Sequence, residues 1–102
     1  MTPAEQTLEL LGGQETVRAY LRGLEDGSEA DEDARRAMLA AIASAEAAGI
    51  QPIMARHEPY LYGQYCLLLC RLWADAEDAA EPAITRQARA LCLQLRYDPR
   101  NQ

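Results

Sequence analysis

Apolar residues recur at helical spacing along most of the chain, and no stretch alternates apolar and polar residues as a half-buried strand does. The opening stretch over 2–13 predicts a short helix, because Thr2 and Glu5 can form a capping box around Pro3 and two glycines follow. Apolar residues over 14–27 also follow helical spacing, so a second helix is predicted there.

The clearest helical pattern covers residues 28–50, whose alanine-rich body favours helix by propensity. We expect Asp31 to cap the N-terminus of this helix, and Gly49 followed by Ile50 is typical of a Schellman ending. A last helix is predicted between Pro82 and Pro99, with apolar residues repeating at intervals of four, three and four: Ile84, Ala88, Leu91 and Leu95.

The most apolar part of the chain is YGQYCLLLCRLWADAED, residues 62–78. Four of its polar side chains fall on one narrow helical stripe: Gln64, Arg71, Asp75 and Asp78. A helix that is apolar around most of its circumference is buried on most sides. We therefore predict a central helix over about 60–77 and expect its largest side chains to anchor the core, namely Leu68, Leu69, Leu72 and Trp73.

Together these patterns predict an all-α fold, a compact bundle of four to five helices around the central helix. The 102 residues suffice for one modest core, so we expect a single helical domain over 1–102, with a tail over 98–102 that could be flexible. The longest uncharged segment, 59–70, has 12 residues, whereas a membrane span needs roughly 20. No membrane span is expected, and the N-terminus has no basic segment of the kind that begins a secretory signal.

Charge divides the chain into two unequal parts. All 10 basic residues are arginines, and 16 acidic residues give a net charge of −6, so general affinity for nucleic acid or an anionic membrane is not expected. Residues 1–81 hold 6 arginines against 15 acids, a net charge of −9, whereas residues 82–102 hold 4 arginines against Asp98 alone, a net charge of +3. This asymmetry suits contacts between copies or docking of the basic segment on an acidic partner, and equally an arginine-decorated solvent face.

The sequence offers three candidate chemical sites, a zinc site, a His–Cys dyad and a calcium loop, and its residue patterns support each of them poorly. Cys66, Cys70 and Cys92 with His57 could nominally bind zinc, but a C-x3-C pair inside a leucine-rich helix is more typical of buried free cysteine. A dyad of His57 and Cys66 has nothing to orient the imidazole ring. The acidic stretch EDGSEADED lacks the residue order of a calcium loop and is more typical of a solvated turn before a helix. We therefore expect no enzyme activity, no metal and no cofactor.

The order of these elements resembles the small head–tail connector (adaptor) proteins of long-tailed phages and prophages. The similarity covers 15–97: a short helix ending in YLR (20–22), an acidic turn over 25–33, an alanine-rich helix to Ala48, the apolar YCLLLCRLWADAED, and a closing LCLQLRY. The N-terminal MTPAEQTLELLGG and the loop QPIMARHEPYLYG depart from the family pattern.

The resemblance implies a subunit that forms a ring below the portal protein and extends the DNA channel, with portal and tail-completion proteins as partners. It places the protein in the cytoplasm of the bacterial host during assembly and then in the virion. An acidic channel lining would let DNA slide, because phosphate finds no counter-charge there. The candidate lining is Glu25, Asp26, Glu29, Asp31, Glu32 and Asp33, and the candidate partner-binding residues are Arg86, Arg89, Arg96 and Arg100.

Two other functions stay open. A small acidic inhibitor or regulator that occupies a basic surface of a host nucleic-acid-binding complex would show the same charge and the same lack of catalytic motifs. An enzyme built on His57 and the cysteines is a weaker third hypothesis. Self-association separates the connector from the inhibitor, because a ring subunit must contact its own copies, whereas an inhibitor can act as a monomer.

Overall fold

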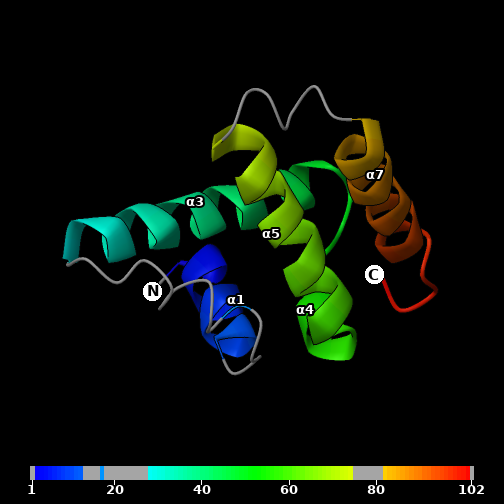
Figure 1. Cartoon of the computed structure of the whole chain (residues 1–102). Coiled ribbons are helices and arrows are strands. Elements are labelled where there is room, and N and C mark those ends of the chain that lie inside the picture. Colours follow the sequence, from blue (N-terminus) through cyan, green and yellow to red (C-terminus); the bar gives the residue numbers. More distant parts are fainter. Residues whose placement is uncertain (1, 13–16, 18–27, 75–81, 102) are drawn as a thin grey trace.

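Five helices make up the part of the chain that the computed structural model describes, residues 2–12, 17, 28–74 and 82–101 (Figure 1). They are α1 (Pro3–Leu11), α3 (Ser28–Ala47), α4 (Met54–His57), α5 (Pro59–Ala74) and α7 (Pro82–Arg96). Every regular element among these residues is a helix, which confirms the all-α prediction. The helix predicted over 14–27 lies outside the described residues, apart from Val17.

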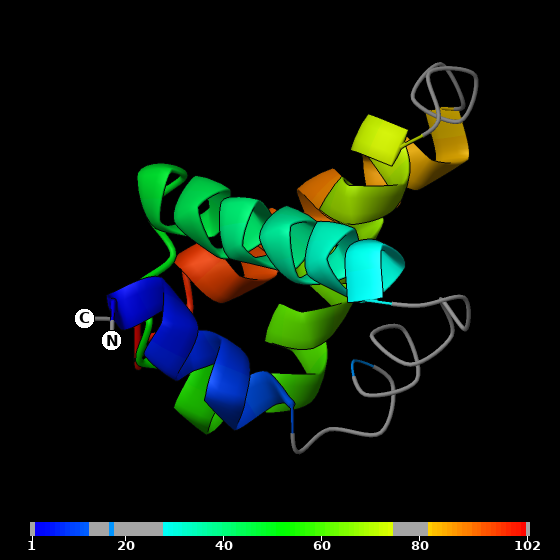
Figure 2. The ribbon, with the colours of Figure 1, turned by 90° about the vertical axis from the view of Figure 1, so that its left-hand side faces the viewer.

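Helix α5 is the centre of the bundle. It packs against α7, α3, α4 and α1. In Figures 1 and 2, α1 and α7 lie on different sides of α5 while α3 crosses it. The prediction of a central helix is confirmed over residues 59–74, and its predicted end at 75–77 lies outside the described residues.

The ends of α1 and α3 follow local sequence signals. Thr2 and Glu5 form the capping box, with the Glu5 amide donating to Thr2 Oγ1 at 3.2 Å, and α1 ends at Gly12 as predicted. At the end of α3, the Ile50 amide donates to the Ala45 carbonyl at 3.0 Å and the Gly49 amide to the Glu46 carbonyl at 3.0 Å, the two bonds of a Schellman motif. Gly49 has a backbone φ of +95°, a value that residues with a Cβ atom rarely adopt.

The prediction that Asp31 caps α3 is wrong, because α3 begins at Ser28 and Asp31 lies inside its first turn. Glu29 and Ala30 tolerate helix well, so no residue before Asp31 stops the helix from extending upstream. A short helix, α4, also replaces the loop expected between Pro52 and Pro59.

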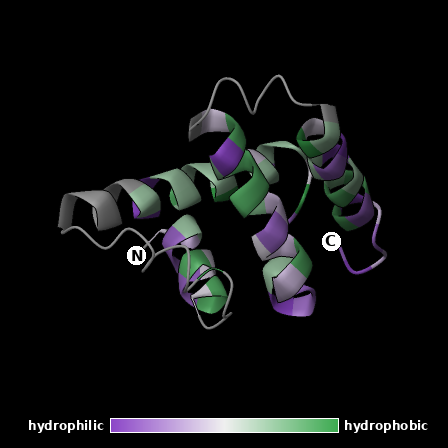
Figure 3. Ribbon diagram, in the orientation of Figure 1, coloured by the Kyte–Doolittle hydropathy of each residue, from purple (hydrophilic) through white to green (hydrophobic). Residues whose placement is uncertain are grey.

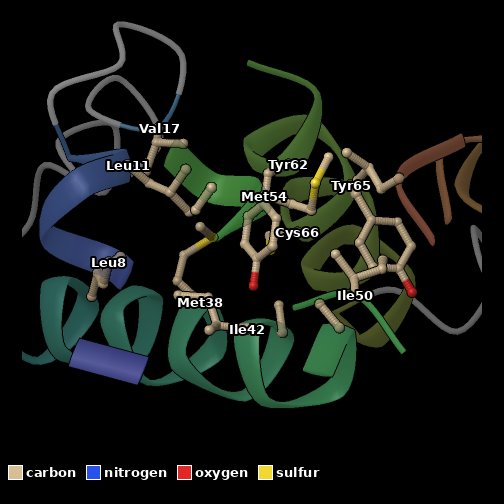
Figure 4. Packing of buried hydrophobic residues seen from close by; sticks show 14 of the residues in the cluster. Leu8, Leu11, Val17, Met38, Ile42, Ile50, Met54, Tyr62, Tyr65 and Cys66 are labelled. Carbon is tan, nitrogen blue, oxygen red and sulfur yellow. The ribbon is translucent and has the colours of Figure 1, made fainter. Parts of the chain in front are cut away.

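The most deeply buried side chains of α5 are not the predicted anchors. Tyr62, Tyr65, Cys66 and Cys70 are buried, and they recur at the three- and four-residue steps of one helix face (Figure 4). The predicted anchors Leu68, Leu69 and Leu72 pack against the core but are only partly buried, and Trp73, near the end of the helix, is 50% exposed. Side-chain size suggested the anchors, whereas the positions of α1, α3 and α7 decide which face of α5 is covered.

Glycine permits one close contact at this centre. A Cβ on Gly63 of α5 would lie 3.1 Å from Cγ2 of Val17, whose side chain is buried. This contact explains a glycine within a helix, where its propensity is poor. Among the described helices, none is long and apolar enough to cross a membrane.

Candidate protein-interaction surface

The solvent-facing side of α7 carries three exposed arginines, Arg86, Arg89 and Arg96. The opposite side packs on the core through Ile84, Ala88 and Leu95, as the sequence predicted, so α7 shows hydrophilic and hydrophobic bands in Figure 3. Within the described part of the chain, no carboxylate forms an ion pair with Arg86 or Arg89. These guanidinium groups therefore remain available to an external anion.

A surface groove of about 380 Å³ lies between α5 and α7. It is lined by Tyr65 and Leu69 of α5 and by Ala88, Arg89, Cys92, Leu93 and Arg96 of α7. Burial, followed by a hydrogen bond with Cys92, raises the pKa of Tyr65 to about 12, so its hydroxyl stays neutral at ordinary pH. Leu93 is 47% exposed, so a large aliphatic side chain lies open to solvent between two arginines.

Arg96 joins this groove to the end of α3. Its guanidinium lies over the ring of Tyr97, 5.5 Å from the ring centroid. The Nε atom would lie 3.2 Å from a Cβ built on Gly49, so the side chain passes closely over the Schellman turn. A cation beside the C-terminal end of a helix is favourable, because the helix dipole is negative there.

The fourth predicted partner-binding residue, Arg100, is paired within the chain. Its guanidinium forms ion pairs with Glu58 and with Asp98, the latter at 2.9 Å. The side-chain hydrogen bond from Arg100, followed by one from its backbone amide, lowers the pKa of Asp98 to about 2. A partner would have to compete with these carboxylates for Arg100.

Asn101 adds three hydrogen bonds to the same corner of the molecule. Its Oδ1 accepts from the Gln51 amide at 2.7 Å, and its Nδ2 donates to the carbonyls of Gly49 and Arg96, both at 2.8 Å. Residues 98–101 make up most of the tail for which flexibility was considered. They bind Glu58, which lies between α4 and α5, and the α3–α4 connection through Gln51 and Gly49. We call these contacts the C-terminal latch.

The predicted acidic surface does not meet the arginines. Glu29, Asp31, Glu32 and Asp33 lie in the first two turns of α3, so this part of the stretch is helix and the predicted turn there is wrong. Glu25 and Asp26 lie outside the described residues. Figure 1 shows the beginning of α3 and helix α7 at opposite sides of the molecule.

Two of the three cysteines, Cys66 and Cys70, behave as core residues. Cys66 and Cys70 are buried, as predicted for free cysteine, and Cys70 Sγ lies 3.7 Å from Met38 Sδ. Burial raises the pKa of the Cys66 thiol, which keeps it protonated and unreactive at neutral pH. His57 is exposed at the end of α4, and the described residues contain no cluster of three side chains able to hold a metal ion.

Sequence reasoning found the arginines of α7 but missed the groove beside them. One signal was present: Leu93 lies outside the apolar repeat of α7, between Arg89 and Arg96, where a polar residue would be expected. The contributions of Tyr65 and Leu69 carried no such signal, because they depend on how α5 crosses α7. The chain matches no family model, no curated protein and no solved structure with which it was compared.

Proposed function

We propose that this chain is a non-catalytic structural protein that binds other proteins through the exposed face of α7. The observation that carries the proposal is the pair of guanidinium groups, Arg86 and Arg89, that no described carboxylate neutralises in a chain with a net charge of −6. Such uncompensated charge favours an acidic partner surface and speeds encounter with it.

The more specific proposal is a phage or prophage head–tail connector subunit that forms a ring below the portal. Its support is the resemblance over 15–97 together with an all-α fold built on a central apolar helix. The proposed location is the bacterial cytoplasm during assembly and the virion afterwards, and the proposed partners are portal and tail-completion proteins.

The test is affinity purification of the tagged chain from lysing cells of its native host, read by mass spectrometry. The connector proposal expects portal and tail-completion proteins, with less of both when Arg86 and Arg89 are replaced by glutamine. Arg56→Gln is the matched control, because it removes one exposed arginine from a different helix, α4. Recovery of a host nucleic-acid-binding complex without virion proteins would reject the connector.

That second outcome would favour the inhibitor, which the net charge of −9 over residues 1–81 also suits. The acidic stretch then becomes the contact surface instead of a channel lining. Neutralising Glu25, Asp26, Glu29, Asp31, Glu32 and Asp33 separates the two roles. In a particle-assembly assay the channel-lining hypothesis expects fewer DNA-filled particles, and normal yields of filled, tailed particles would refute it.

A further inference from the structure

The groove between α5 and α7 combines an apolar floor with a cationic side chain at each end. Tyr65 and Leu69 supply part of the apolar surface from α5, and Leu93 projects from α7 with 47% of its surface exposed. Arg89 and Arg96 are seven residues apart, so their Cα atoms lie two turns apart along the helix, about 10 Å. The groove is therefore suited to an apolar group flanked by two anions.

We propose that this groove binds an acidic helical segment of a partner protein. Two carboxylates of the segment, two turns apart, pair with Arg89 and Arg96, and an apolar side chain between them covers Leu93. An amphipathic helix in a groove between two helices is a common mode of recognition, in which the anchors recur at helical spacing. The matching spacing lets all three contacts form along one face of the bound helix.

Charge complementarity indicates this occupant. Among the described residues, Arg89 has no ion-pair partner and no acidic side chain lines the groove. A neutral apolar helix would cover Leu93 but would bury the two guanidinium groups without a counter-charge, which is costly. An acidic segment covers the leucine and supplies both carboxylates. This inference deepens the proposed function and rests on it for the existence of a protein partner.

The test uses the purified full-length chain and a synthetic alanine-based helical peptide with two glutamates two turns apart and leucine between them. Binding is measured by calorimetry or fluorescence anisotropy at low and high salt. Arg89→Gln and Arg96→Gln should each weaken binding about two- to fivefold, the range for one exposed ion pair. Leu93→Ala should weaken it about fivefold, because burial of the exposed part of that side chain is lost.

Two controls make the test specific. Arg56→Gln removes the same charge from a different helix, α4, and lies outside the groove lining, so peptide affinity should hold within twofold. The second control is a peptide with alanine in place of its leucine. Its affinity for the unchanged protein should equal the affinity of the leucine peptide for the Leu93→Ala variant, because both changes remove the same apolar contact. Equal losses for Arg56→Gln and Arg89→Gln would overturn the proposal, because the peptide would then sense only net charge.

Cys92 provides a second readout that does not depend on substitutions. It lines the groove and is partly exposed, whereas Cys66 and Cys70 are buried, so a thiol reagent should label Cys92 first in the folded chain. Bound peptide should slow that labelling at least in proportion to the fraction bound. Binding without protection would place the peptide elsewhere and overturn the proposal.

Other occupants give different results. Concentration-dependent self-association that Leu93→Ala abolishes would mean that a second copy fills the groove. Tighter peptide binding after neutralisation of the chain's own carboxylates over 75–81 would mean that this segment occupies it. Either result overturns the acidic-partner proposal. In a last outcome, the peptide binds with these mutational effects while the affinity purification recovers no virion proteins. That result would support the groove as a binding site for an acidic helix and would reject only the connector function.

Discussion

Replacing Tyr62 with phenylalanine should stabilise this protein. Tyr62 is fully buried in α5, and its hydroxyl has no hydrogen-bond partner among the described residues. Figure 4 shows the hydroxyl pointing toward α3, among apolar side chains that include Ile42. A hydroxyl that gives up its hydrogen bonds to water on folding and receives none in return opposes folding.

The magnitude follows from the transfer of one hydroxyl. Burying a hydroxyl without a hydrogen bond costs about 1–3 kcal/mol on scales derived from protein mutations. The smaller phenylalanine gives up the dispersion contacts of one oxygen atom, worth a few tenths of a kcal/mol at about 0.1–0.2 per atom pair. We therefore expect Tyr62→Phe to raise the free energy of unfolding by about 1 kcal/mol, which corresponds to roughly 4–8 °C in Tm for a domain of this size.

The assay is urea denaturation followed by far-ultraviolet circular dichroism, with the midpoint rising while the slope m stays constant. Tyr60→Phe is the matched control, because Tyr60 lies on the same helix but is 61% exposed, and its hydroxyl is hydrated in both states. Its free energy of unfolding should change by less than about 0.5 kcal/mol. A loss of 1 kcal/mol or more in Tyr62→Phe would refute the reasoning, because it would mean that the hydroxyl gains a hydrogen bond on folding.

The same burial predicts a fall in stability at alkaline pH. Burial raises the pKa of Tyr62 above its unfolded value of 10.0, and raises that of Tyr65 to about 12. A group whose folded pKa is raised contributes stability that is complete below its unfolded pKa and is lost as pH rises beyond it. The free energy of unfolding should therefore decline above about pH 10, and the decline should be shallower in Tyr62→Phe. An unchanged slope would show that Tyr62 ionises equally in both states.

Three further predictions concern the bundle and the C-terminal latch. Leu95→Ala should lower the free energy of unfolding by about 2–5 kcal/mol, because Leu95 is 1% exposed. Leu93→Ala should lower it by less than about 1 kcal/mol, because Leu93 is 47% exposed. Equal losses of the two variants in urea denaturation would contradict the assigned faces of α7. Arg100→Ala should return the pKa of Asp98 from about 2 toward 3.8, as an NMR titration of its carboxyl carbon would show; a pKa that stays near 2 would mean another group holds it. Gly49→Ala should cost about 1–2 kcal/mol in thermal unfolding, because φ is +95° and the new Cβ would meet Arg96; an unchanged Tm would show that the turn can relax.

Local signals predicted the ends of helices more reliably than the identity of the core. Thr2, Glu5 and Gly49 act within a few residues of themselves, so capping and C-terminal motifs could be identified from the sequence. The fully buried residues of α5 could not, because the polar stripe marks the outer side of the helix but does not say how far α1, α3 and α7 cover the rest. Tyr62 and Cys66 are fully buried because α1 and α3 pack against α5. Trp73, near the end of the helix, is 50% exposed.

The candidate surface shows the same division between local and tertiary information. The arginines of α7 follow from the helical repeat, and Leu93 stands out in that repeat as a large aliphatic residue between charges. The groove itself requires α5 to cross beside α7, so that Tyr65 and Leu69 close its other wall. Arg100 shows the opposite error, since its sequence position groups it with the other arginines while the fold turns it toward Glu58. Arginines that the sequence groups together therefore differ in the fold: Arg100 is paired within the chain, whereas Arg86 and Arg89 form no ion pair with the described residues.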